Sequence, residues 1–133
     1  MGGITDLKVL LETMEPRVNE EEYVFCNVKE VDYGLCEKLK PICMYVEQGE
    51  GMTLVLLDTV AKENGFDTSV RFKSITLTVH SSLEAVGLTA AVSKKLTEKG
   101  VCANVIAAYY HDHVFVPSSK IDLAIAALGE FKK

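Results

Sequence analysis

The sequence predicts an α+β protein, and three observations between residues 74 and 116 favour this fold class. In residues 74–80, apolar and polar side chains alternate, as in a strand with one buried face. After a short break, Leu88, Ala91, Val92 and Leu96 recur at helical spacing, and Gly100 follows where a helix commonly ends. Residues 101–110 then form the longest apolar run, which we interpret as a second strand covered on both faces by a second layer or a partner chain.

The second half also resembles a known family. Residues 79–105 read VHSSLEAVGLTAAVSKKLTEKGVCANV, and this stretch is similar to the ACT domain. The positions that carry the resemblance are His80, Gly87, Leu88, Gly100, Val101 and Asn104. The resemblance implies a ferredoxin-like βαββαβ module that binds amino acids and regulates other proteins, with helices packed on one face of an antiparallel sheet. The whole chain resembles the small tandem-ACT proteins of bacteria, which are related to the ACT modules of cytosolic arginine sensors.

The first half predicts the same order of elements, preceded by an extra helix. This helix covers residues 7–14, is capped by Thr5 and cannot extend far past Pro16. We expect strands at residues 23–28, 42–46, 53–57 and 68–72, short helices at residues 32–39 and 58–64, and a hairpin turn at residues 49–51. The sequence therefore predicts two ACT-like modules, residues 1–73 and residues 74–133.

The end of the chain departs from the family pattern. Residues 110–113 are expected to form a polar hairpin tip, and Ser119 with Asp122 resembles a capping box for a final helix. After Phe131 only two lysines remain, so the second module has no fourth strand of its own. Either the first half lends a strand, with residues 23–28 as the candidate, or the sheet continues across a subunit boundary.

Composition excludes several classes of protein. With 133 residues, 48% of them hydrophobic, the chain can bury a sizeable core. A net charge of −5 argues against nucleic-acid binding, and Lys94, Lys95 and Lys99 are interpreted as the solvated face of one helix. No run approaches the roughly 18 apolar residues of a membrane span, and no signal peptide is recognisable, so we expect a cytoplasmic protein without membrane contact.

The cysteines and histidines do not predict a metal site or a catalytic centre. Cys26, Cys36, Cys43 and Cys102 lack metal-binding spacing, and the three that lie in apolar strand-like runs, Cys26, Cys43 and Cys102, are typical of buried free thiols. His80, His111 and His113 suggest a metal site, but no fourth ligand is evident and solvated histidines are the simpler interpretation. No recognised catalytic motif is present, so we expect no enzyme activity and no cofactor.

The segment from Ser81 to Leu88 is the main functional candidate. A loop that joins a strand to a helix N-terminus presents free backbone N–H groups, and the helix dipole favours a carboxylate there. Gly87 would let a ligand approach the backbone closely. The alternative is that Ser81 and Glu84 form a capping box, with the helix starting early and Gly87 inside it. By resemblance, ACT modules use this loop together with a facing second strand to hold their effector.

Other residues complete the predicted ligand site. Asp112 or Glu84 could pair with the ammonium group of an amino acid, although an exposed turn aspartate is the alternative for Asp112. Asn104, inside an apolar strand, could bond the loop or a ligand carboxylate. The full predicted set is Ser81, Ser82, Glu84, Val86, Gly87, Leu88, Asn104, Ile106 and Asp112.

These observations predict a non-enzymatic regulatory protein that senses a small amino-acid effector. We expect it to act as a homo-oligomer, as a dimer, and to signal through a separate, unidentified partner protein, because no catalytic or DNA-binding domain is attached. The alternatives are a ligand-free scaffold or oligomerisation module and, less favoured, a small metal-dependent enzyme using His80, His111, Asp112 and His113.

Overall fold

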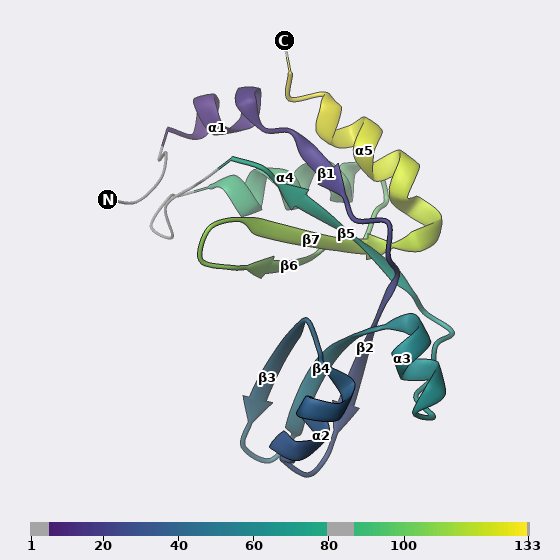
Figure 1. Ribbon diagram of the computed structural model, residues 1–133. Coiled ribbons are helices and arrows are strands. Elements are labelled where there is room, and N and C mark those ends of the chain that lie inside the picture. The colour runs from purple at the N-terminus through teal and green to yellow at the C-terminus, as the bar shows by residue number, and fades with distance from the viewer. Residues whose placement is uncertain (1–5, 80–86, 133) are drawn as a thin grey trace. The chain divides into compact units, whose positions relative to one another are not determined.

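The structure is a computed structural model that describes residues 6–79 and 87–132 (Figure 1). The chain divides into two compact units. The larger unit joins residues 1–20 to residues 73–133, and the smaller unit covers residues 21–72. The N-terminal segment therefore packs with the second half of the chain and not with the residues that follow it.

The larger unit contains an antiparallel sheet. Its order is β1-β5-β7-β6, and the strands are β1 (Pro16–Val18), β5 (Phe72–Leu77), β7 (Asp112–Pro117) and β6 (Asn104–Ala107). Pro16 lies opposite Leu77 in the β1·β5 pair, and Asn104 lies opposite Phe115 in the β6·β7 pair. Because β1 and β6 are at the two ends of this order, the unit is a four-stranded sheet to which the N-terminal segment contributes one outer strand.

The fourth strand of the sheet in the larger unit is not the segment that the sequence suggested. Residues 23–28 were the predicted lender, but they form β2 (Tyr23–Val28), which pairs along its whole length with β4 (Gly51–Leu57). Strand β2 meets β5 only at the Tyr23–Phe72 pair, whereas β1, only three residues long, pairs with residues 75–77 of β5. The first half does lend a strand, as the sequence suggested, but it is β1.

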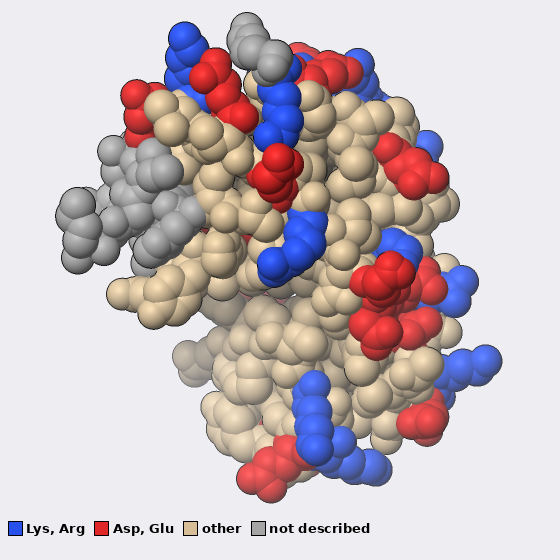
Figure 2. Space-filling model, turned by 45° about the horizontal axis from the view of Figure 1, so that its top comes forward, with Lys and Arg blue, Asp and Glu red and all other residues tan. Residues whose placement is uncertain are grey.

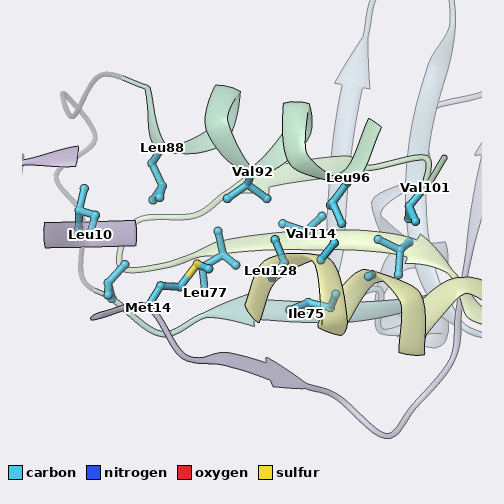
Figure 3. Close-up of a cluster of buried hydrophobic side chains, with 14 residues drawn as sticks. Leu10, Met14, Ile75, Leu77, Leu88, Val92, Leu96, Val101, Val114 and Leu128 are labelled. Atoms are coloured by element: carbon cyan, nitrogen blue, oxygen red, sulfur yellow. The ribbon is translucent and has the colours of Figure 1, made fainter. Parts of the chain in front are cut away.

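Three helices cover one face of this sheet. They are α1 (Leu7–Thr13), α4 (Leu88–Glu98) and α5 (Ile121–Gly129), the last preceded by the short 3-10 helix η1 (Ser118–Lys120). Figure 3 shows their apolar side chains meeting those of β5 and β7. Leu10, Leu77, Leu96 and Val114 are fully buried in this cluster. Each such side chain contributes roughly 1.5–3 kcal/mol of burial free energy.

The smaller unit contains three strands and two helices. Strands β3 (Cys43–Glu47), β4 and β2 lie side by side in that order, all antiparallel, and the helices are α2 (Tyr33–Leu39) and α3 (Asp58–Glu63). Gly51 opens β4 with a φ of +87°, and a Cβ there would lie 2.1 Å from the carbonyl oxygen of Val28. Only glycine fits this close approach, which explains the hairpin turn read from residues 49–51.

Most predicted elements are present, with four local corrections. Asp6 is the N-cap of α1 and accepts a hydrogen bond from the N–H of Val9, whereas Thr5, the predicted cap, lies outside the described residues. Of the strand expected at residues 68–72, only Phe72 lies in a strand, because β5 begins there and runs to Leu77. Residues 101–110 contain only the short strand β6, whose residues are half-buried or exposed. The predicted capping box of Ser119 and Asp122 is wrong, because α5 starts with no side-chain cap hydrogen bond.

The polar face of β5 is also more buried than expected. Ser74 and Thr76, which alternate with the core residues, are 5% and 7% exposed. Within the described residues, no helix has the length and apolar character needed to cross a lipid bilayer.

Candidate functional site

The N-terminus of α4 is where the sequence placed the ligand site. Gly87 is the N-cap residue, with a φ of +99°, and α4 begins at Leu88. The first helical backbone bond runs from the N–H of Ala91 to the carbonyl oxygen of Gly87. Gly87 is therefore outside the helix, and the alternative in which it lay inside an earlier-starting helix is wrong. Among the described atoms, no side chain caps the helix at this position.

Four of the predicted site residues fall outside the described part of the chain. They are Ser81, Ser82, Glu84 and Val86, together with His80 from the suggested metal site. Leu88 is described and is 3% exposed, so its side chain belongs to the hydrophobic core beside the helix start.

The space beside the Cα atom of Gly87 is occupied. A Cβ atom built on Gly87 would lie 3.1 Å from Cδ2 of Leu7, on the first turn of α1. The sequence reasoning assigned this space to a ligand. In the structure the side chain of Leu7 lies there, and positive φ is the second reason for glycine at this position.

Asp112 lies at the same end of the sheet as the start of α4. The expected hairpin tip is shorter than predicted, because the turn closes with a bond from the N–H of Ala108 to the carbonyl oxygen of His111, and Asp112 already belongs to β7. Strand residues two apart share a face, so Asp112 is on the face of Val114 and Val116, which both pack under the helices. Its exposure is 8%, so it is not an exposed turn aspartate.

Asn104 and Ile106 lie on the other face of the sheet. Asn104 pairs with Phe115 and Ile106 with His113, and these partners alternate with the residues that face the helices. The amide Nδ2 of Asn104 donates to the carbonyl oxygen of Phe115 at 3.4 Å. The sheet therefore separates these two residues from Gly87, Leu88 and Asp112, which the structure brings to one end of the helix-covered side.

A polar row on the sheet face opposite to α1, α4 and α5 was not anticipated. Thr76 Oγ1 lies 2.9 Å from Nδ1 of His113, and Arg17 is the register partner of Thr76 on β1. Burial is the largest cause of a lowered pKa for His113, and the charges of His111 and Arg17 lower it further, while Asp112 raises it. The signal in the sequence was the alternation of residues 112–116, which places residue 113 on the face opposite to Val114.

The surface also has a depression and a cluster of ion pairs, and neither contains a residue of the predicted ligand site. An open depression of about 280 Å³ is lined by Lys8, Leu11, Glu12, Glu130 and Phe131. Glu130 is paired with Lys95 and Lys99, which hold the pKa of its carboxyl group below the usual value through hydrogen bonds. In the view of Figure 2, acidic and basic side chains are interspersed over the surface.

The four cysteines differ in their burial. Cys26 is buried, which raises its pKa, whereas Cys36 and Cys43 are half-buried and Cys102 is exposed. The expectation that the thiols are buried therefore holds only for Cys26. Over residues 6–79 and 87–132, no group of three His, Cys, Asp or Glu side chains is placed to hold a metal ion.

The arrangement of the larger unit defines a class of protein. A four-stranded antiparallel sheet with helices on one face, in which a strand leads to a helix start through a loop, is the ferredoxin-like plan. Two ACT domain family models match the chain in tandem, one over residues 2–73 and one over residues 70–130. The chain therefore belongs to the ACT domain family.

Several solved structures share this fold. A crystal structure of a Vibrio cholerae protein, titled as of unknown function and a possible transport protein, shares 50% sequence identity, covers 96% of this chain and 95% of that chain, and gives a TM-score of 0.86. The regulatory subunit of aspartate kinase from Thermus flavus is 8% identical, with 87% and 95% coverage and a TM-score of 0.65, which shows a shared fold. An Agrobacterium tumefaciens protein at 12% identity covers 89% and 88%, with a TM-score of 0.65. No curated protein matches the chain.

Proposed function

We propose that this chain is a non-enzymatic regulatory protein that binds a small amino acid at the start of α4 and signals through a partner protein. The observation that carries the proposal is the pairing of two features at one end of the larger unit. The helix start follows Gly87 with no side-chain cap among the described residues, and Asp112 lies nearly buried on the same side of the sheet.

These two features suit the two charged ends of an amino acid. The first-turn N–H groups and the helix dipole favour an α-carboxylate, and a shielded carboxylate such as Asp112 favours an ammonium group. The loop residues Ser81, Ser82, Glu84 and Val86 belong to the proposed site by their place in the sequence. Asn104 and Ile106, on the opposite face, would contact a ligand only from a neighbouring module, as the family resemblance implies.

The effector would act by changing how modules or subunits pack. A ligand shifts such an equilibrium only by the difference in its affinity for the two states. Leu7 is placed to take part, because α1 packs its side chain beside Gly87 at the edge of the proposed site. Binding that moves Leu7 would connect the site to the N-terminal segment, and through β1 to the sheet.

The second candidate function, a scaffold or oligomerisation module, is favoured by one strand. β3 lies at the outer end of its sheet and exposes Met44, Tyr45 and Val46, with Tyr45 at 69%. Exposed apolar edge strands tend to pair with another chain. We propose that two copies of this chain associate along β3, whether or not a ligand is bound, so this surface is compatible with both candidates.

Thermal-shift screening against the standard amino acids separates the two functions. A ligand that binds only the native state at 100 times its Kd adds about 2.7 kcal/mol of stability, which raises the melting temperature by several degrees. The α-amide and the deaminated acid of any active amino acid serve as matched controls, because each lacks one of the two charges that the site would hold. Equal shifts with these analogues would place the site elsewhere, and no shift with any amino acid would favour the scaffold.

A further inference from the structure

Three sulfur atoms meet in the smaller unit, away from the site proposed above. Sγ of Cys36 lies 3.7 Å from Sδ of Met44 and 3.8 Å from Sδ of Met52. The three side chains come from three elements, α2, β3 and β4, which Figure 1 shows together in this unit. Met44 and Met52 share one sheet face, because Met44 pairs with Leu54, two residues from Met52.

The cluster has more acceptors than donors. A thiol carries one proton, and a thioether is only a weak acceptor with no proton to give. The Cys36 thiol can therefore donate to one of its two thioether neighbours at a time, although both lie at nearly the same distance. A single cation between the three sulfurs would satisfy all of them at once.

We propose that Cys36, Met44 and Met52 form a binding site for a soft monovalent metal ion, copper(I). Thiolate and thioether ligands select copper(I) over harder ions, and one thiolate with two thioethers neutralises a single positive charge. The two distances from Cys36 fit such a site, because sulfurs roughly 2.3 Å from a common metal in tetrahedral directions are about 3.8 Å apart. Binding replaces the thiol proton: the Cys36 S–H bond breaks, the sulfur–metal bond forms, and the proton passes to water, with no change of oxidation state.

The site is closed on one side and open on the other. Met52 is fully buried and Cys36 half-buried, while 38% of Met44 is exposed. An ion can therefore reach the cluster from the Met44 side without unfolding the unit. Zinc is disfavoured, because its structural sites use four charged or imidazole ligands and thioethers are poor partners for it.

The test uses silver(I), which has the same ligand preference and needs no reducing agent, and follows the methionine methyl groups of the full chain by NMR. Substoichiometric silver nitrate should shift the Met44 and Met52 methyl signals and leave that of Met14, in the other unit, unchanged. Met44→Leu and Met52→Leu should each weaken silver binding at Cys36 at least several-fold. Both substitutions nearly conserve side-chain volume, so each variant should still unfold in one cooperative transition.

The other cysteines require a matched control. Cys43 is next to Met44 on β3, with its side chain on the opposite sheet face, so Cys43→Ser should leave the methionine shifts unchanged and Cys36→Ser should abolish them. The proposal is overturned if silver binds Cys36 without moving either methionine signal, or if the two leucine variants bind silver as tightly as the parent chain. Neither outcome bears on amino-acid binding, which the proposed function assigns to the larger unit.

Discussion

Gly87 has two separate reasons to be glycine. Its φ of +99° is strained for other residues, and Leu7 lies where a Cβ would be. Gly87→Ala should therefore destabilise the protein by about 1–3 kcal/mol, and this loss should be measurable by urea unfolding. Gly100→Ala is the matched control, because Gly100 also has positive φ, +75°, with nothing within 4 Å of the added carbon. Equal losses in the two variants would show that the contact with Leu7 costs nothing.

Substitution of Gly87 affects the fold as well as the space that the sequence analysis assigned to a ligand. A bulky residue such as valine at this position would block a ligand and would also strain the fold. Loss of binding in Gly87→Val alone would therefore be ambiguous. Leu7→Ala offers a cleaner probe, since it opens space beside Gly87 without changing the backbone conformation.

His113 makes stability depend on pH. Its pKa lies below the ordinary value of 6.5, chiefly through burial, so the unfolded chain binds the proton more readily than the folded chain. This contribution to stability is fully present above pH 6.5 and is lost as the pH falls from there toward the folded pKa. Urea unfolding should show this decline between pH 7.5 and pH 5.5, and His113→Asn should reduce it. His111→Asn should keep most of the decline, whereas an unchanged slope in His113→Asn would contradict the assignment.

At the scale of elements, the sequence predicted those helices and strands whose side chains show a regular periodicity. The helical stripe of α4 and the alternation in residues 74–80 appear directly in the sequence; α4 forms where it was expected, and β5 covers residues 74–77 of the predicted strand. β1 was missed because three residues, one of them proline, carry no periodicity, and only pairing with β5 makes them a strand. The sequence also did not predict how the site residues are divided between the two sheet faces. The length of the turn after β6 fixes the register of β6 against β7, and this register places Asn104 and Asp112 on opposite faces.

Helix α1 belongs to the core of the larger unit. Leu10 is fully buried against residues from β5, α4 and α5 although it lies more than sixty positions before them in the chain. Leu10→Ala should cost about 2–5 kcal/mol in urea unfolding, since it leaves a cavity. Val9→Ala, at a 40% exposed position on the same helix, should change stability by no more than about 0.5 kcal/mol. Similar small losses in both variants would mean that residues 1–20 do not share this core.

At the scale of the whole molecule, the exposed strand β3 predicts self-association. Tyr45→Lys places a charge on the edge of the sheet, where lysine commonly prevents pairing. Analytical ultracentrifugation should show a dimer for the parent chain and a shift toward monomer for this variant. Tyr33→Lys, at a 60% exposed position on α2, is the control and should remain dimeric. A parent chain that is monomeric, or a Tyr45→Lys variant that dimerises as tightly, would remove β3 as the contact.

Two ACT domains in tandem fit a regulatory chain, and the larger unit joins a helix start to a shielded carboxylate at one end. Both groups would be needed for one zwitterion, so removing either charge should weaken binding.

Isothermal titration of the standard amino acids into the full chain, repeated with Asp112→Asn, tests this most directly. We expect at least one amino acid to bind with one site per chain and Asp112→Asn to weaken it by roughly tenfold or more, a loss of about 1.4 kcal/mol. Asp122→Asn, at an exposed position on α5, should bind like the parent. Binding of no amino acid, or equal affinity in the Asp112→Asn variant, would contradict the proposed site.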